Sequence, residues 1–438
     1  MTTTETNPAD AVAGTPPRRR GGLLRHRDFR LLWAGETISK VGGTVTAVAV
    51  SLVAVDVLGA GGFEMGLLRA MSWVPWLLIG LPAGAWTDRM RRRPVMLTVD
   101  LVSMLLFLSV PIAAWAGALT MTQLLAVTLL AGVGQVFFSA AYQAYLPTIV
   151  DKEDLAEGNA KLAGSEQVAM VAGPGLGGLV VQALGAATGL LTQAVGFLVS
   201  AICLRAIRAE EPPVERKAVQ TTLRKDIGEG LRYVVRDPYL RVLALCSAVD
   251  NLTLSGAQAL LVIFLFREVG EGPSTVGLLI GADALGGVLG ALIATRIVKR
   301  FGSGRALLLA ALGATPFGLL IPLTRPGSGL VFFVLGLMIP SIGIVVMNVV
   351  VNGFRQSYCP PDLLGRIFTS SRFVAFGVIP IGALLGGVLA DAVGIREAMW
   401  VLLAATTLGK LLRLLGPFRS QRVLPTEPPK PPAEEVSR

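Results

Sequence analysis

Long apolar runs separated by short polar segments repeat along the 438-residue chain. Each run holds about 20 or more residues and lacks the strict alternation of a β-barrel strand, so we expect membrane-spanning helices. Twelve spans are predicted, near residues 30–56, 64–86, 95–117, 121–147, 158–182, 187–207, 239–266, 274–298, 305–324, 329–352, 366–391 and 395–416.

One long polar segment, residues 208–238, interrupts this pattern and divides the spans into two groups of six. We therefore predict two six-helix domains, 29–207 and 239–418, joined by a cytoplasmic linker. Residues 1–28 and 419–438 are expected to be a disordered arm and tail.

The second part of the linker has helical periodicity. Its apolar positions recur at spacings of four, four and three, opposite basic residues, which predicts an amphipathic helix on the cytoplasmic surface. The apolar positions are Leu223, Ile227, Leu231 and Val234. A merely solvated linker helix is an equally good interpretation.

Composition restricts the class of protein further. Hydrophobic residues make up 53% and charged residues 16%, with a mean hydropathy of +0.65, which excludes an ordinary soluble protein. The net charge of +10 comes from short clusters between apolar runs, which indicates inner-face loops and no nucleic-acid partner. Only Arg267, Arg325 and Arg396 fall in loops assigned outside, so both termini are predicted to be cytoplasmic in a multi-pass protein of the cell inner membrane.

Residues suited to cofactors, metals or enzymatic catalysis are scarce. His26 is the single histidine, and Cys203, Cys246 and Cys359 have no metal-ligand spacing, so we expect no metal and no cofactor. The chain has no phosphate-binding loop of an ATP-driven pump and no clustered nucleophile and base at membrane depth, so we expect no enzyme.

A glycine-rich apolar run ends in a carboxylate and four arginines between the second and third spans. The matching positions, separated as Gly-x-x-x-Asp-Arg-x-Gly-Arg-Arg, resemble the loop between helices 2 and 3 of the major facilitator superfamily. They are Gly84, Asp88, Arg89, Arg92 and Arg93, and Arg91 departs by replacing the usual glycine. The resemblance implies an all-α fold of twelve helices in two pseudo-symmetric halves.

An internal repeat agrees with two related halves, because Gly173–Val180 recurs 209 residues later as Gly382–Leu389. The arginine loop also has a degenerate copy at 295–308, in which Lys299 replaces Asp88. We therefore predict that Asp88 is a conformational latch, pairing with a helix N-terminus or a basic residue such as Arg366 or Arg372.

The fifth span holds four residues, Gly173, Pro174, Gly177 and Gly178, that allow a bend and close helix approach. They resemble the Gly-Pro signature of drug/proton exporters in the same superfamily. Small-residue packing without directional meaning is the alternative.

Acidic residues inside spans are costly unless they are paired, hydrated or neutralised, so they are candidates for proton coupling. They are Asp250, Asp283, Glu36 and Glu166. A structural carboxyl is the alternative for each, and for Glu36 an ion pair with Lys40 one turn away. Arg69 is expected to extend its side chain to the outer membrane surface.

Neutral polar and aromatic residues suit a cavity for a bulky amphipathic ligand. The candidates are Gln135, Tyr142, Trp73, Trp76 and Asn251. With the loops after spans 4 and 6, the chain resembles the enterobactin-exporter and macrolide-efflux branch. This implies a monomeric exporter of a drug, antibiotic or secondary metabolite in exchange for protons, embedded in membrane lipid. The alternatives are a nutrient importer or facilitator and, in another class, a non-transporting membrane sensor.

Overall fold

The computed structural model describes residues 22–87, 89–209, 211, 223–416, 418 and 421–426. These residues form helices and connecting loops, without a strand in the ranges given. The first half contains α1 (Arg27–Leu52), α2 (Gly62–Thr87), α3 (Arg92–Trp115), α4 (Met121–Ile149), α5 (Leu155–Leu184), α6 (Ala186–Gly189) and α7 (Leu191–Ala206), with a short π-helix η2 (Val53–Val57) continuing α1.

The second half begins after α8 (Leu223–Arg236). It contains α9 (Pro238–Ile263), η3 (Phe264–Val269), α10 (Pro273–Phe301), α11 (Ser303–Leu309), η4 (Ala310–Ala314), η5 (Thr315–Leu323), α12 (Leu330–Tyr358), α13 (Pro361–Gly377), α14 (Ile379–Val393), α15 (Ile395–Gly409) and α16 (Leu412–Leu415). Short 3-10 turns, η1 (Leu23–Arg25) and η6 (Gly327–Gly329), precede α1 and α12.

Each of the twelve predicted spans coincides with a helix or a helix pair. In the described ranges, ten helical segments are long and apolar enough to cross a membrane. The remaining two predicted spans are occupied by α2 and by α15 with α16. Three of the predicted spans are interrupted, between α6 and α7, between α13 and α14, and between α15 and α16. Pro380, near the start of α14, has no backbone N–H to continue the preceding helix.

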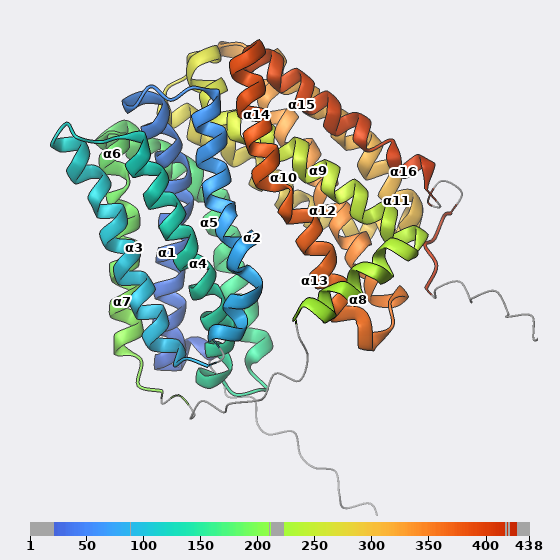
Figure 1. Ribbon diagram of the computed structural model, residues 1–438, viewed down its shortest axis with the longest axis horizontal. Coiled ribbons are helices and arrows are strands. Elements are labelled where there is room, and N and C mark those ends of the chain that lie inside the picture. Colours follow the sequence, from blue (N-terminus) through green and yellow to red (C-terminus); the bar gives the residue numbers. More distant parts are fainter. Residues whose placement is uncertain are drawn as a thin grey trace, which may run out of the picture.

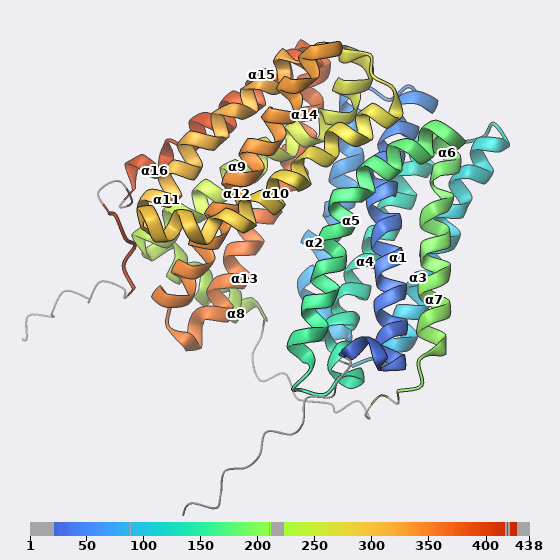
Figure 2. The same cartoon turned by 180° about the vertical axis from the view of Figure 1, so that it is seen from behind.

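The two halves lie side by side and meet at only one end (Figures 1 and 2). α2 and α5 of the first half pack against α14 and α10 of the second. The helices approach at the end opposite α8 and diverge toward the end that carries α8. We call the α5–α10 and α2–α14 contacts the two seams.

Glycines allow the backbones to touch at both seams. A Cβ on Gly178 would clash with the Pro273 carbonyl oxygen, and one on Gly277 with that of Pro174. At the other seam, a Cβ on Gly387 would lie 2.6 Å from the Gly62 carbonyl oxygen. Because these helices have no side chain at the crossing, each pair packs at backbone distance.

The sequence repeat recurs as a repeat of contacts. Gly173 and Gly177 on α5 face Thr44 and Val45 on α1, whereas Gly178 faces the other half. The equivalent glycines 209 positions later make equivalent contacts. Gly382 and Gly386 face Leu252 and Gly256 on α9, and Gly387 faces α2. In each half, the repeated glycines therefore allow close packing both between two helices of that half and against a helix of the other half.

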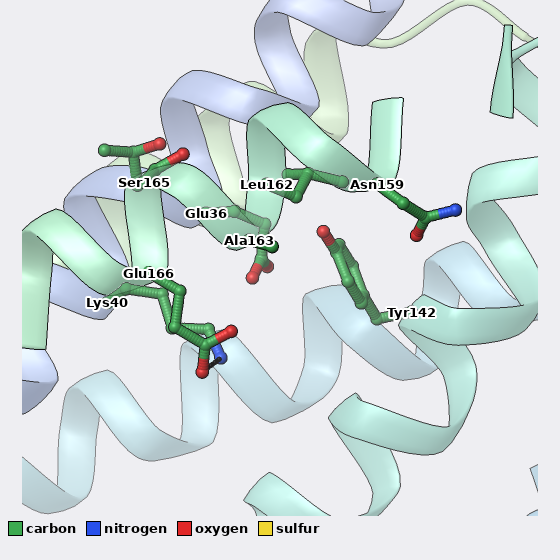
Figure 3. A pocket seen from close by; sticks show the side chains of 9 residues that line it. Glu36, Lys40, Tyr142, Asn159, Leu162, Ala163, Ser165 and Glu166 are labelled. Carbon is green, nitrogen blue, oxygen red and sulfur yellow. Dashed lines mark hydrogen bonds and ion pairs between the residues drawn. The ribbon is translucent and has the colours of Figure 1, made fainter. Parts of the chain in front are cut away.

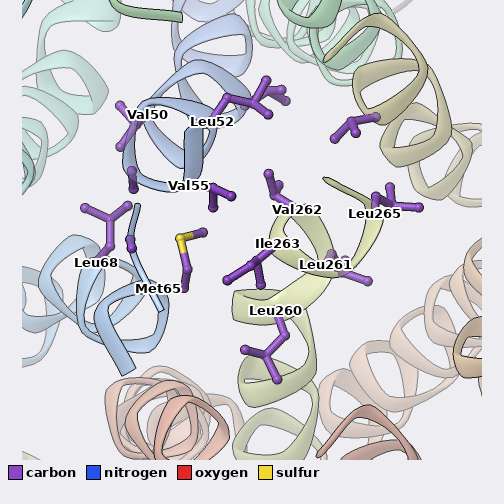
Figure 4. Close-up of a cluster of buried hydrophobic side chains, with 14 of the residues drawn as sticks. Val50, Leu52, Val55, Met65, Leu68, Leu260, Leu261, Val262, Ile263 and Leu265 are labelled. Atoms are coloured by element: carbon purple, nitrogen blue, oxygen red, sulfur yellow. The ribbon is translucent and has the colours of Figure 1, made fainter. Parts of the chain in front are cut away.

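Polar contacts and an apolar cluster complete the closed end. Both oxygens of Asp391, at the end of α14, accept from the start of α2, at 2.8 Å from Gly62 N and 3.1 Å from Phe63 N. Apolar side chains from both halves meet beside them, including Leu52 and Met65 with Leu260 and Ile263 (Figure 4). Exposing one such buried side chain to water costs about 1.5–3 kcal/mol, so opening this end requires compensation.

The predicted linker helix is present as α8 and packs against α13 and α9. Val234 is buried, whereas Leu231 is 39% exposed. A Cβ on Gly230 would meet the Arg366 carbonyl oxygen at 2.5 Å, and the Glu229 carboxylate pairs with the Arg366 guanidinium. The Leu223 and Ile227 side chains lie outside the described residues, as do the predicted arm before Gly22 and most of the tail.

Gly178→Ala should loosen the closed end, because its methyl group would clash with α10. The measurement is the spin-label distance between cysteines replacing Trp115 and Leu323, both at the end opposite α8, in a chain whose three native cysteines are replaced. We expect longer distances. Gly175→Ala is the matched control, since a Cβ there meets nothing within 4 Å. Equal distance distributions in the two variants would show that the seam does not close this end.

Candidate functional site

Two neighbouring cavities lie within the first half. The first, about 180 Å³, is lined by Glu36, Thr37, Lys40, Tyr142, Asn159, Leu162, Ala163, Ser165 and Glu166. The second, about 210 Å³, is lined by Glu36, Ser39, Lys40, Gly43, Thr44, Val99, Asp100, Gln135, Phe138, Gln193 and Phe197. Glu36 and Lys40 belong to both, so the cavities meet along one face of α1.

The first cavity contains an ion pair between two helices. The Lys40 ammonium on α1 lies 3.3 Å from a Glu166 carboxylate oxygen on α5, and Figure 3 shows both side chains pointing toward each other. Glu36, one helical turn before Lys40, instead turns toward the space that the Tyr142 ring also faces. The ion pair of Lys40 is thus formed with Glu166 of α5, and not with Glu36, the intrahelical alternative that the sequence offered.

The charges at this site differ in exposure. The Lys40 and Glu166 side chains are 39% and 42% exposed, whereas Glu36 is 6% exposed. A half-exposed ion pair contributes at most about 1 kcal/mol, so it can break and re-form. A neighbouring contact holds α5 to α1, since the Trp33 indole N–H donates to the Ser165 hydroxyl at 2.9 Å.

Asp250 lies elsewhere, in a buried cluster of charges in the second half. One of its carboxylate oxygens is 2.6 Å from the Lys410 ammonium and 2.9 Å from the Arg413 guanidinium. Both cations are buried, with side chains 4% and 5% exposed. The structure thus gives Asp250 two partners near the end of the last span, and its role as a proton carrier stays a prediction.

Among the described residues, the other candidates of the second half form no hydrogen bond or ion pair with this cluster. Asp283 is an exposed position of α10 beside Ser341 of α12. The Asn251 amide donates to the Ser247 carbonyl of its own helix at 2.9 Å. Neither side chain lines the two cavities of the first half.

The arginine loop has a structural role at the α8 end. Arg93 donates to the carbonyl oxygens of Leu204, at 2.9 Å, and Arg205, at 2.7 Å, which ties the start of α3 to the end of α7. Glu211 accepts from the backbone N–H groups of Arg92 and Arg93, which lack helical partners. Gly84 is partly buried, and Arg89 is exposed.

The predicted latch cannot be placed, because Asp88 lies outside the described residues. Of its proposed partners, Arg366 pairs with Glu229 on α8. Arg372 lies over the Phe368 and Phe376 rings, 5.9 and 5.2 Å from their centroids.

The aromatic and amide candidates do not share one site. Tyr142 lines the first cavity and Gln135 the second. Trp73 on α2 packs across the halves against Phe376 on α13, with ring centroids 5.7 Å apart. Trp76 is 40% exposed and lines neither cavity.

Arg69 does not extend to the membrane surface, so that expectation is wrong. Its guanidinium donates to the Ser255 hydroxyl at 3.3 Å and to the Gln258 side chain, both on α9. The interface of the two halves supplies these acceptors, which the sequence alone does not bring near.

A family described as transmembrane secretion effector matches residues 22–435. The chain belongs to this family. Its members belong to the major facilitator superfamily, so this member is a multi-pass membrane transporter and not an enzyme, as the motifs predict.

Relatives of this family member include two efflux proteins. It is 28% identical to the multidrug efflux pump Tap of Mycolicibacterium fortuitum over 88% of this chain and 93% of that one. It is 19% identical to macrolide efflux protein A of Streptococcus pyogenes over 86% and 92%. The predicted efflux branch of the superfamily is therefore confirmed.

Solved structures share the fold. A bacterial homologue of the iron transporter ferroportin in its inward-facing state is 18% identical and covers 91% of this chain and all of that one, with a TM-score of 0.72. The outward-facing structure of that homologue has a TM-score of 0.56. These likenesses confirm the major facilitator fold.

Three important charges were missing from the candidates predicted from sequence. Asp100 lies inside the predicted span 95–117, so the reasoning that selected acidic residues within spans also applies to it. Lys410 and Arg413 resemble ordinary span-end cations in the sequence, and only the packing of α15 and α16 beside α9 brings them to Asp250.

Asp250→Asn should destabilise this transporter, because it leaves two buried cations without their carboxylate, at a cost of about 3–5 kcal/mol. The measurement is thermal unfolding of the purified protein, where we expect a lower midpoint that Asp250→Asn combined with Lys410→Met partly restores. Asp283→Asn is the matched control, because it makes the same change at an exposed carboxyl. An unchanged midpoint together with loss of gradient-driven transport would instead favour the proton-carrier role.

Proposed function

We propose that this transporter exports hydrophobic or amphipathic small molecules, of the kind that multidrug and macrolide efflux proteins carry, in exchange for protons. The observation that carries the proposal is the Glu36, Lys40 and Glu166 site in the first half. An acid-rich cavity that also has aromatic walls suits both a proton and a bulky ligand.

The arrangement of the halves supports alternating access. One end is closed by glycine seams, and the halves diverge toward the other end. The basic residues Arg89, Arg91, Arg92 and Arg93 are at that divergent end, which the positive-inside rule assigns to the cytoplasm. This conformation is then inward-facing, in agreement with the better match to the inward-facing neighbour.

The ion pair of Lys40 with Glu166 connects the cavity to the seam. Glu166 lies on α5, the helix whose Gly178 packs against α10. A ligand or proton that changes the partner of Lys40 therefore changes the restraint on a helix of the closed end. Transport requires that ligand and proton each favour one of the two conformations.

The direct test is uptake of a labelled macrolide into proteoliposomes containing the purified protein. With an acidic interior, molecules oriented as in inverted membranes exchange internal protons for external macrolide. We expect accumulation that collapses when a protonophore removes the gradient. Lys40→Met should reduce it at least tenfold, whereas Lys152→Met, in the loop after α4, should not.

Two results would contradict this proposal. Macrolide uptake that does not depend on the imposed proton gradient would exclude proton exchange from the mechanism. Intact cells that accumulate a labelled compound only when they produce this protein would support the importer.

A further inference from the structure

A buried carboxyl of the first half has no ion-pair partner among the described residues. Asp100 on α3 is 1% exposed. Ser200 of α7 lies beside it, but neither carboxylate oxygen meets hydrogen-bond geometry with any described group. A buried carboxylate without a donor or cation is strongly disfavoured, so this position needs an occupant.

The space next to Asp100 is the second cavity, about 210 Å³. Glu36 lines the same cavity, and its carboxyl interacts electrostatically with that of Asp100. Gln193 presents a buried side-chain oxygen, also without a hydrogen bond. The buried oxygens left without a hydrogen bond here belong to Asp100 and Gln193, so this part of the cavity favours an occupant that donates hydrogen bonds or carries positive charge.

The helices around Asp100 supply few cations. α1 contributes Glu36 and Lys40, while α4 and α7 contribute the neutral Gln135, Gln193 and Ser200. Among the residues that line the two cavities, Lys40 is the single cation, and its ammonium is paired with Glu166 of α5. Three carboxyls therefore share one ammonium, and among the described residues Glu36 and Asp100 have no cation within ion-pair distance.

We propose that Asp100 and Glu36 together hold one exchangeable proton, which makes Asp100 a proton-binding residue of the exchange. This rests on the proposed function. Two neighbouring carboxyls in a low-dielectric site resist ionising together, so the proton belongs to the pair, and it leaves when the nearby Lys40 ammonium compensates the second negative charge. Water on one side of the membrane protonates a carboxylate oxygen, and that O–H later returns its proton to water on the other side.

The proton also sets the partner of Lys40. When the pair is protonated, Lys40 stays with Glu166 and holds α5 to α1. When the proton leaves, the pair gains a negative charge at the wall of a cavity that Lys40 already lines. The ammonium then has a competing partner on its own side, and α5 loses one restraint.

The test uses the full-length protein in lipid nanodiscs and follows the infrared C=O stretch of protonated carboxyls during a pH titration. We expect a titrating band in the wild type that Asp100→Asn and Glu36→Gln each remove or shift. Asp100→Glu should retain a titrating band. The exposed carboxyl of Asp56 gives the control, since Asp56→Asn should leave this band unchanged.

Macrolide transport supplies the second measurement. In Asp100→Asn, gradient-driven uptake should fall at least tenfold, while exchange of labelled for unlabelled macrolide at equal pH stays within twofold of wild type. Wild-type protein that titrates but shows no gradient-driven uptake would contradict the proposed function and leave the proton site intact.

Three results would overturn the proton site. The first is a titration that Asp100→Asn does not alter. The second is gradient-driven uptake that Asp100→Asn does not alter. The third is a wild-type cavity that shows no protonated carboxyl but responds to sodium ions, because the occupant would then be an alkali cation.

Discussion

Backbone contact between helices of opposite halves is the constraint on which this structure depends. In lipid, apolar helices gain little free energy by contacting each other instead of hydrocarbon. Tight association therefore needs close approach of the main chains. Gly178 and Gly277 provide it at one seam, and Gly387 with Gly62 at the other. The closed end of the molecule depends on these four positions.

The seams are related in packing but differ in polarity. At the α2–α14 seam, the Asp391 carboxylate accepts hydrogen bonds from the backbone N–H groups at the start of α2, which have no partner within their own helix. At the related position of the other seam, α10 begins with Pro273, which has no N–H to donate. The α2–α14 contact therefore includes an exposed carboxylate, whereas the α5–α10 contact relies on packing.

The charged side chains of the interior fall into two groups, one suited to holding the fold together and one suited to proton exchange. Asp250 has two buried cations, which suits a fixed element of the second half. Lys40 and Glu166 form a half-exposed pair that can dissociate, and Asp100 has no hydrogen-bonding partner among the described groups. The groups best suited to change state are thus gathered in the first half, next to the helix that carries a seam glycine.

The sequence by itself determined the helical class, the twelve spans and the division into halves, because hydrocarbon requires long apolar helices and tolerates charge only between them. The repeat from Gly173 to Gly382 also predicted which residues permit close packing. The tertiary structure decided which charged side chains form ion pairs. Lys40 pairs with Glu166 instead of Glu36, and Asp250 meets cations more than 150 residues away. The reason is physical: spacing within one helix shows which residues share a face, but ion pairs across helices depend on rotations and crossings that apolar sequences leave undetermined.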